Sequence, residues 1–294
     1  MILPGVFKAV SPTLSPARLI IARFASSASD EVKLEKLTGD YNNISIIGLN
    51  RPAAKNAFSH SLVNQLSSIV EHLKYDKDSR VVILRSLVPG IFCAGADLKE
   101  RKKQTQEEVR IFVNQLRALL INIEQLPMPV IAAVDGAALG GGLEMALACD
   151  IRTASEEAKL GLVETRLAII PGAGGTQRLP RILGPALAKE LIFTSRILSG
   201  KEAHQLGVVN HVLPQNEAKD AAYQKALQIA ADIVPNGPIG VRMAKKAIDK
   251  GIQVDIATGY AIEEACYAQI LPTTDRLEGL KAFAEKRKPI YKGE

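Results

Sequence analysis

The sequence predicts an α/β protein, with a core of alternating strands and helices followed by a helical C-terminal region. Short apolar runs at residues 44–49, 81–84 and 130–134 are typical of buried strands. The segments between them repeat apolar residues with the period of a helix. A chain of 294 residues that is 47% hydrophobic can form one globular domain with a substantial core.

The first half alternates strand and helix in order. The strand at Ile44–Leu49 (ISIIGL) ends at the turn-forming residues 50–52 (NRP), and Ser59 can cap the helix that follows. The apolar face of that helix consists of Leu62, Val63, Leu66, Ile69, Val70 and Leu73. The run at 81–84 (VVIL) is continuous rather than alternating, which predicts a strand covered on both faces.

A second helix is predicted from Thr105 to Ile123. Thr105 and Glu108 have the spacing of a capping box, and prolines at 127 and 129 end the segment. The run at 130–134 (VIAAV) is then strand-like and leads into a glycine-rich turn, followed by a helix at Leu143–Cys149. These strands and helices indicate a core built from ββα or βαβ units.

The remainder of the chain is mainly helical, with prolines between the segments. Helices are expected around residues 184–193, 201–207, 216–234, 238–251 and 256–270. We therefore expect a core at 30–225 and a helical region at 226–294.

The first 29 residues differ in composition from the rest. They contain Lys8, Arg18, Arg23 and five serines, and the first acidic residue is Asp30. This composition predicts a mitochondrial targeting peptide, and hence a matrix protein; a tail with no targeting role is the alternative. Without its three positive charges the net charge falls from +6 to +3, which weakens the case for nucleic-acid binding. No apolar run is long enough to span a membrane.

Cysteine and histidine give no sign of a metal site. The three cysteines (Cys93, Cys149 and Cys266) form no CxxC pair, and the four histidines have no ligand spacing. We expect no disulfide and no metal, and we interpret Cys93 as a packed thiol because its neighbours are apolar.

The segment Gly136–Asp150 (GAALGGGLEMALACD) carries the first candidate for chemistry. Glu144 is the only charged residue between Asp135 and Asp150, and it is surrounded by apolar residues. A carboxylate on such a helix is seldom buried without a partner or a task, and burial raises its pKa into the range of acid–base catalysis. A buried ion pair is the alternative. The glycines at 140–142 permit close approach of a ligand or close helix–sheet packing.

Two further segments complete the pattern. Glu164 precedes a second glycine-rich turn (PGAGGT, 171–176), and two carboxylates can take a proton from water and deliver one to carbon. A surface salt bridge to Arg166 is the alternative role for Glu164. The small-residue turn around Ala96 can present a backbone N–H to a substrate carbonyl, and with the N–H of Gly141 it would form an oxyanion hole.

At these segments the sequence resembles the enoyl-CoA hydratase/isomerase (crotonase) superfamily, from about residue 34 to the C-terminus. The matching stretches are NRP at 50–52 with Asn56-Ala57, CAGADLKE at 93–100, ALGGGLEMALACD at 138–150 and IPGAGGTQRL at 170–179. The resemblance implies a spiral of ββα units with a helical C-terminal trimerisation region, assembled as homotrimers or homohexamers.

The resemblance also implies roles for individual residues. The N–H groups of Ala96 and Gly141 would hold the thioester oxygen, Glu144 would act as the base on water, and Glu164 would give the proton to C2. Lys286 would reach the nucleotide of a neighbouring subunit. Other expected contacts with the substrate or its coenzyme A are Ala54, Lys55, Ala94, Gly95, Asp97, Leu98, Lys99, Gly140 and Gly172. Coenzyme A enters as part of the substrate, so no separate cofactor is expected.

The stretches at 90–101 (GIFCAGADLKER) and 161–171 (GLVETRLAIIP) resemble the branch that hydrates 3-methylglutaconyl-CoA to 3-hydroxy-3-methylglutaryl-CoA in leucine degradation. General short-chain enoyl-CoA hydration and double-bond isomerisation are alternatives. The distal carboxylate of that substrate would need a cation; candidates are Arg166, Arg117 and residues 101–103. RNA binding is an alternative of another class, which the mixed charges of segment 55–80 do not favour.

Overall fold

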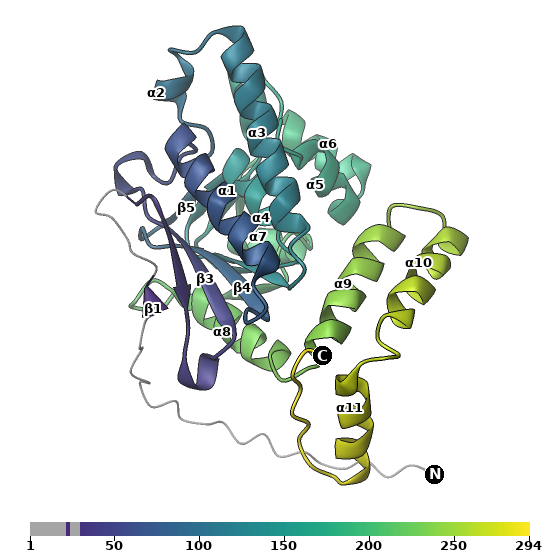
Figure 1. Cartoon of the computed structure of the whole chain (residues 1–294). Coiled ribbons are helices and arrows are strands. Elements are labelled where there is room, and N and C mark those ends of the chain that lie inside the picture. The colour runs from purple at the N-terminus through teal and green to yellow at the C-terminus, as the bar shows by residue number, and fades with distance from the viewer. Residues whose placement is uncertain (1–21, 24–29) are drawn as a thin grey trace.

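The computed structural model describes residues 22–23 and 30–294 and contains two β-sheets (Figure 1). The seven-stranded sheet consists, in spatial order, of β1 (Ala22–Arg23), β2 (Val32–Lys36), β3 (Ile44–Leu49), β4 (Val81–Ser86), β6 (Val130–Val134), β8 (Ile151–Ser155) and β11 (His211–Leu213). The four-stranded sheet consists of β10 (Leu198–Ser199), β9 (Lys159–Gly161), β7 (Ala137–Leu139) and β5 (Ile91–Cys93). Apart from β1, the predicted targeting peptide lies outside the described residues.

Successive pairs of strands divide between the two sheets. β4, β6 and β8 lie side by side in the large sheet, while β5, β7 and β9, which follow them in sequence, are neighbours in the small one. Helices follow these pairs: α2 (Leu98–Arg101) and α3 (Gln106–Glu124) after β5, and α4 (Gly141–Leu147) after β7. The expected ββα repeat is confirmed.

The central strands are buried on both faces, as their continuous apolar runs predict. In β3, Ile47 and Leu49 point into the larger core while Ile44 and Ile46 point into the smaller one. In β4, Val82 and Leu84 likewise alternate with Val81 and Ile83. This period of two follows from the pleat of a strand and requires a helix layer on each face.

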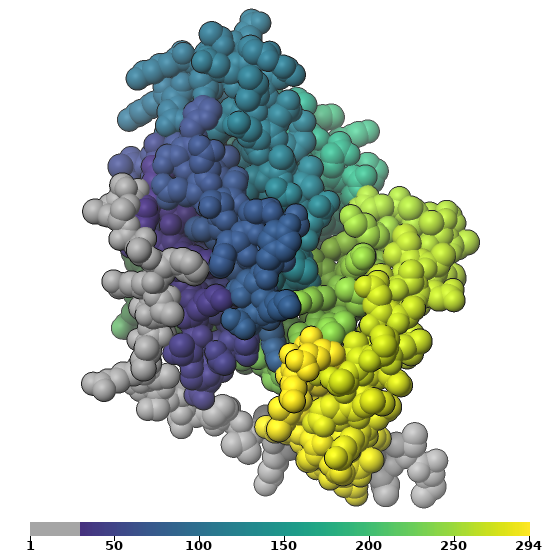
Figure 2. All heavy atoms as spheres, in the orientation of Figure 1, coloured from purple at the N-terminus to yellow at the C-terminus, as the bar shows by residue number. Residues whose placement is uncertain are grey.

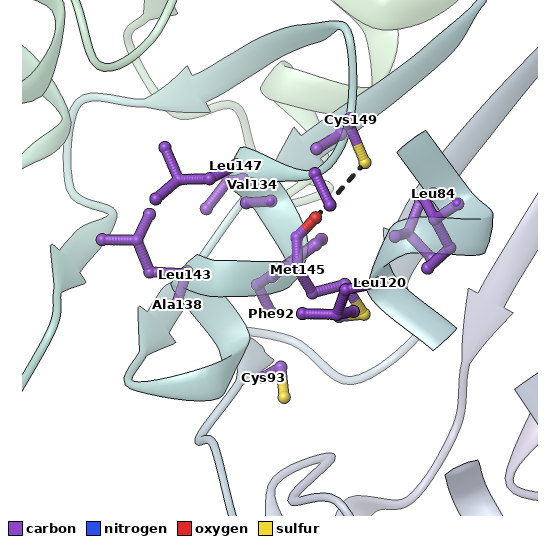
Figure 3. Close-up of a cluster of buried hydrophobic side chains, with 14 of the residues drawn as sticks. Leu84, Phe92, Cys93, Leu120, Val134, Ala138, Leu143, Met145, Leu147 and Cys149 are labelled. Carbon is purple, nitrogen blue, oxygen red and sulfur yellow. Dashed lines mark hydrogen bonds between the residues drawn. The ribbon is translucent and has the colours of Figure 1, made fainter. Parts of the chain in front are cut away.

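The larger core lies beneath α1 (His60–Tyr75), α3 and α4, and against the small sheet. Both expected helix starts are confirmed, because Ser59 caps α1 and Thr105 forms a capping box with Glu108 at α3. Side chains of β4, β5, α3 and α4 meet around Leu84, Phe92, Leu120 and Met145 (Figure 3). This packing fixes α4, and with it Glu144, against β5.

The smaller core is covered by α8 (Ala221–Ile233), through Ala226, Leu227 and Ala230. The expected boundary between residues 225 and 226 falls within this helix. Beyond it, α9 (Pro238–Gly251), α10 (Ile256–Ala268) and α11 (Thr274–Ala284) lie to one side of the core, where they form a projecting region (Figures 1 and 2). Lys245 of α9 is joined to Asp150 of the core by an ion pair of 2.8 Å.

The expected helices after residue 183 are α6 (Pro185–Phe193), α7 (Gly200–Gln205), α8, α9 and α10, with ends within a few residues of the expected ones. Three helices of the described residues were not expected: the short α2, α11, and α5 (Gly175–Leu183), which contains Pro180. A proline inside a helix normally argues against it because its nitrogen cannot donate. Among residues 30–294 there are also three short 3₁₀ turns: η1 (Gly39–Tyr41), η2 (Pro52–Ala54) and η3 (Glu164–Leu167).

Candidate active site

The loop after β5 and the N-terminus of α4 bring two backbone N–H groups together. Gly95 has a φ of +89°, and a Cβ added to it would lie 3.3 Å from the Gly141 nitrogen. The flanking groups are fixed, since Phe58 N–H donates to Gly95 O (2.7 Å) and Asp97 N–H donates to Phe58 O (3.2 Å). Within the described part of the chain, the N–H groups of Ala96 and Gly141 have no acceptor. They are therefore free to donate to one substrate oxygen.

The three glycines at 140–142 differ in their surroundings, and close packing of the helix is confirmed for Gly142. Gly140 has a φ of +54°, a conformation that favours glycine. A Cβ on Gly142 would lie 2.1 Å from the carbonyl oxygen of Cys93, so Gly142 permits close packing of α4 against β5. A Cβ on Gly141 would lie 3.8 Å from Glu144 Oε2, on the side of the candidate reacting groups.

Glu144 lies in the first turn of α4 and is buried, with 2% of its surface exposed. Its Oε1 accepts hydrogen bonds from the N–H groups of Ala173 (2.8 Å) and Gly175 (2.7 Å) in the second glycine-rich turn. Burial raises the pKa of Glu144, and these two N–H donors partly oppose that rise. No ion pair of Glu144 occurs among residues 30–294, so the alternative of a buried ion pair is wrong.

Glu164 begins η3 and has a different environment. Its Oε1 lies 3.2 Å from the position of a Cβ on Gly140, and its Oε2 is buried without a hydrogen-bond partner in the described structure. Burial, with a further contribution from the nearby charge of Glu144, raises the pKa of Glu164 to about 7. The alternative of a salt bridge to Arg166 is wrong, because that guanidinium donates to Ser195 O (2.9 Å) instead.

The two carboxylates thus flank the Gly140–Gly141 peptide in different states. Glu144 is held by two donors, while Glu164 is partly protonated at neutral pH and has one oxygen unpaired. A reacting carbon held near the N–H of Gly141 would have an acid and a base within reach. This combination suits proton transfer at a carbon next to a thioester carbonyl.

The other expected binding residues fall into two groups. Ala94, Gly95, Leu98 and Lys99 lie in or next to the oxyanion-hole loop, and Ala54 and Lys55 join them because Ala94 N–H donates to Lys55 O (3.1 Å). The amino groups of Lys55 and Lys99 belong to exposed residues at this edge. The second group is Asp97, Gly172 and Lys286, which have partners within the chain or lie away from this loop.

The carboxylate of Asp97 is engaged within the chain. It caps α2 and forms an ion pair of 2.8 Å with Arg51. Gly172 presents its carbonyl to Arg117 Nε (2.9 Å), and Lys286 is exposed just after α11 with a φ of +54°. Within this one chain Lys286 belongs to the projecting C-terminal region, not to the loops that carry the carboxylates.

Arg51 is a positioning residue whose role is not evident from the sequence. It donates to Glu31 Oε1 (2.7 Å) and Ala57 O (3.0 Å) as well as pairing with Asp97. It thereby links the turn after β3 to the oxyanion-hole loop. The sequence shows Arg51 directly before a proline in the NRP turn, but its ion-pair partners Glu31 and Asp97 are distant in sequence. The N–H groups of Ala173 and Gly175 were missed for the same reason.

Cys93 is a packed thiol, as expected. Its Sγ donates to Asn56 O (3.0 Å), and burial raises its pKa to about 12. Across residues 22–23 and 30–294, no three His, Cys, Asp or Glu side chains are grouped so as to hold a metal ion. No helix in this part of the chain has the length and apolar character needed to cross a bilayer.

Comparison with known proteins identifies the family. The model of the enoyl-CoA hydratase/isomerase family matches residues 39–294. The chain belongs to this family. It is 59% identical over 265 residues to human mitochondrial methylglutaconyl-CoA hydratase, covering 90% of this chain and 78% of that protein. It is 54% identical over 284 residues to human mitochondrial enoyl-CoA hydratase domain-containing protein 2, covering 95% and 97% of the two chains.

A solved structure agrees with the fold. The enoyl-CoA hydratase from Bacillus anthracis superposes with a TM-score of 0.86 at 49% identity, covering 90% of this chain and all of that one (100%). The predicted crotonase fold and the prediction of a hydro-lyase of the enoyl-CoA hydratase class are confirmed. The similarity to mitochondrial proteins supports the mitochondrial location that the leader predicts.

Proposed function

We propose that this enzyme hydrates 3-methylglutaconyl-CoA to 3-hydroxy-3-methylglutaryl-CoA in the mitochondrial matrix. The observation that carries the proposal is that Glu164 and Glu144 lie on either side of the Gly140–Gly141 peptide. The buried Oε2 of Glu164 has no hydrogen-bond partner in the described structure, and the pKa of this residue is raised to about 7. The choice of acyl group is supported by the identity of 59% to a protein named for that substrate.

In the proposed reaction, the N–H groups of Ala96 and Gly141 donate to the thioester oxygen. Glu144 takes a proton from water as the water oxygen bonds to C3, and the C2=C3 electron pair moves toward the carbonyl to give an enolate. The two N–H donors stabilise this enolate, and protonated Glu164 delivers its proton to C2. Water is added with no net change in oxidation state, and coenzyme A takes part only as a portion of the substrate.

The test measures the loss of enoyl-thioester absorbance and the mass of the product. Wild-type enzyme should add one water to 3-methylglutaconyl-CoA, and Glu144→Gln and Glu164→Gln should each lower kcat by at least about 100-fold. A product of unchanged mass would instead establish isomerisation. If the wild type hydrates crotonyl-CoA much faster than 3-methylglutaconyl-CoA, the proposed acyl group is wrong.

We also propose that the chain forms homotrimers through its C-terminal region, which pair into hexamers. Large apolar side chains are exposed there, including Ile252 (75%), Phe283 (87%) and Ile290 (75%). Exposed apolar surface of this extent is typical of an interface. Sedimentation equilibrium of wild type should give a multiple of three chains, and Phe283→Lys should shift the mass toward one chain. A monomeric wild type at micromolar concentration would contradict this.

A further inference from the structure

The proposed substrate brings a problem of charge to the active site. Its acyl chain ends in a second carboxylate, and the site already contains the carboxyl groups of Glu144 and Glu164. Burial of a further negative charge beside them without a positive partner would be strongly unfavourable. If the proposed function holds, a cation near the active site must pair with this distal carboxylate.

Most of the arginines around the site are already engaged. Arg117 donates to Gly172 O (2.9 Å) and Asn114 Oδ1 (3.1 Å), and Arg178 forms an ion pair of 2.7 Å with Glu124. Arg166 is exposed and donates to Ser195 O. Each of these guanidinium groups would have to give up a partner in order to bind a substrate carboxylate.

Arg101 differs from them. In the part of the chain that the structure describes, its guanidinium forms no hydrogen bond and no ion pair. Its positive charge lowers the pKa of Glu164, in opposition to burial, so it acts on the reacting carboxyl group. Arg101 also lines a small cavity of about 10 Å³ together with Ala96, Phe58, Gln104 and Phe112.

This cavity is next to the oxyanion-hole loop and has room for about one water-sized group, so it can receive a carboxylate oxygen but no larger part of the substrate. Two acidic residues line it, yet both have other partners. Asp97 is paired with Arg51, and Glu100 Oε2 accepts from the N–H of His60 (3.2 Å). The positive charge of Arg101 is therefore available to a ligand.

The backbone fixes Arg101 relative to the reacting groups. Asp97 follows Ala96 directly and caps α2, whose last residue is Arg101, and Arg101 N–H donates to Asp97 O (3.0 Å). Less than two helical turns thus separate the backbone of Arg101 from the N–H of Ala96, and both residues line the same cavity. A substrate held at Ala96 by its thioester can therefore extend its distal end toward Arg101.

We propose that Arg101 binds the distal carboxylate of the substrate and thereby selects dicarboxylic enoyl-CoA thioesters. A guanidinium forms charge-assisted hydrogen bonds to a carboxylate oxygen, which add direction as well as affinity. A substrate without the carboxylate would leave Arg101 solvated and lose this contribution.

The test compares ligands that differ in the distal carboxylate and cannot react: glutaryl-CoA, which has it, and butyryl-CoA, which does not. Calorimetric titration of the wild type should give tighter binding of glutaryl-CoA. Arg101→Gln should weaken glutaryl-CoA binding by about 10- to 100-fold and change butyryl-CoA binding less than about threefold. Arg101→Lys should retain part of the preference. Arg110→Gln removes an exposed guanidinium paired with Glu107 on α3, and should change neither ligand.

The outcomes separate this inference from the proposed function. If wild type shows no preference for glutaryl-CoA, or if Arg101→Gln weakens the binding of both ligands equally, Arg101 does not bind the distal carboxylate. Equal melting temperatures of the two arginine variants exclude a loss of fold. Because binding is measured without turnover, a wild type that prefers glutaryl-CoA but fails to hydrate 3-methylglutaconyl-CoA would overturn the proposed reaction alone.

Discussion

The carboxylate of Glu144 and the backbone N–H of Gly175 are joined by a hydrogen bond of 2.7 Å that ties α4 to the N-terminus of α5. The N–H of Ala173 donates to the same oxygen. Because Oε1 is occupied, Oε2 remains as the oxygen that can take a proton from water. The second glycine-rich turn therefore orients Glu144, the proposed base, and need not touch the substrate itself.

Glu144→Gln should separate this orienting role from acid–base chemistry. The amide oxygen of glutamine can still accept from both N–H groups, so the melting temperature should stay within a few degrees of wild type. The amide cannot take a proton, so kcat should fall by about 100- to 10,000-fold. Thermal unfolding and initial rates with the same preparations check this, and retention of more than a tenth of the wild-type kcat would exclude Glu144 as the base.

The raised pKa of Glu164 predicts how the rate depends on pH. If Glu164 must be protonated to deliver a proton to C2, kcat/KM should fall about tenfold for each pH unit above about 7. Glu164→Gln should remove this limb from whatever activity remains. A wild-type rate that stays level to pH 9 would rule out protonated Glu164 as the form that acts.

The same group should make the folded protein less stable at alkaline pH. A carboxyl group whose pKa is raised on folding stabilises the folded state at pH values below its unfolded pKa, and this contribution is lost as pH rises through about 7. Glu164→Gln should therefore be more stable than wild type at pH 8.5, by about 1–2 kcal/mol after allowance for solvent screening, with a much smaller difference at pH 5.

Chemical denaturation at both pH values measures this difference. Glu157→Gln is a suitable control, since it makes the same substitution at an exposed residue on a turn. Equal stability of wild type and Glu164→Gln at pH 8.5 would show that the carboxylate is well solvated. A gain in stability together with a loss of activity is the pattern expected of a functional group that is costly to bury.

The burial of Glu144 could be predicted from the sequence more fully than that of Glu164, for a physical reason. Every neighbour of Glu144 on its helix is apolar, so the local sequence already places the carboxylate in the core. The neighbours of Glu164 are mixed, and both Val163 and Thr165 are only partly buried. The burial of Glu164 comes from its position against Gly140, which no local pattern records.

The same distinction applies to the fold. The strands β3, β4 and β6 and the helices α1 and α3 carry periodic apolar residues and caps, so their positions could be predicted closely. The division of strand pairs between two sheets depends on contacts such as Gly142 against Cys93 and Gly136 against Gly90, which are between residues distant in sequence. Only the family resemblance supplied that arrangement.

Gly142→Ala tests one of those contacts. Its Cβ would lie 2.1 Å from the carbonyl oxygen of Cys93, a backbone atom that cannot rotate away, so the free energy of unfolding should fall by about 2–4 kcal/mol. Gly240→Ala is the matched control, because a Cβ at Gly240 in α9 has open space around it and should leave stability unchanged or slightly higher. Urea unfolding measures the free energy of unfolding of both variants. If it changes equally in the two, α4 can move away from β5 without loss of stability.

Arg51→Met should weaken the loop that presents the N–H of Ala96. Breaking a largely buried ion pair leaves Asp97 and Glu31 without their cation, which should cost about 2–4 kcal/mol at pH 7. Burial raises the pKa of Asp97, but the hydrogen bond from Arg51, together with those from the helix-cap N–H groups, outweighs burial, so the pKa is lowered on folding. The stability that Asp97 contributes is therefore present above its unfolded pKa and is lost as pH falls through its lower folded pKa. The difference between wild type and variant should therefore shrink in acid.

Urea unfolding at pH 7 and at pH 3.5 measures this change, with Arg110→Gln as the control for loss of an exposed arginine in an ion pair. The control should leave stability nearly unchanged at either pH, because an exposed ion pair contributes little. We expect Arg51→Met also to raise KM for enoyl-CoA thioesters, because the 95–97 loop would lose the link between Asp97 and the turn after β3. A variant as stable as wild type at pH 7 would show that Asp97 holds the loop through its helix cap alone.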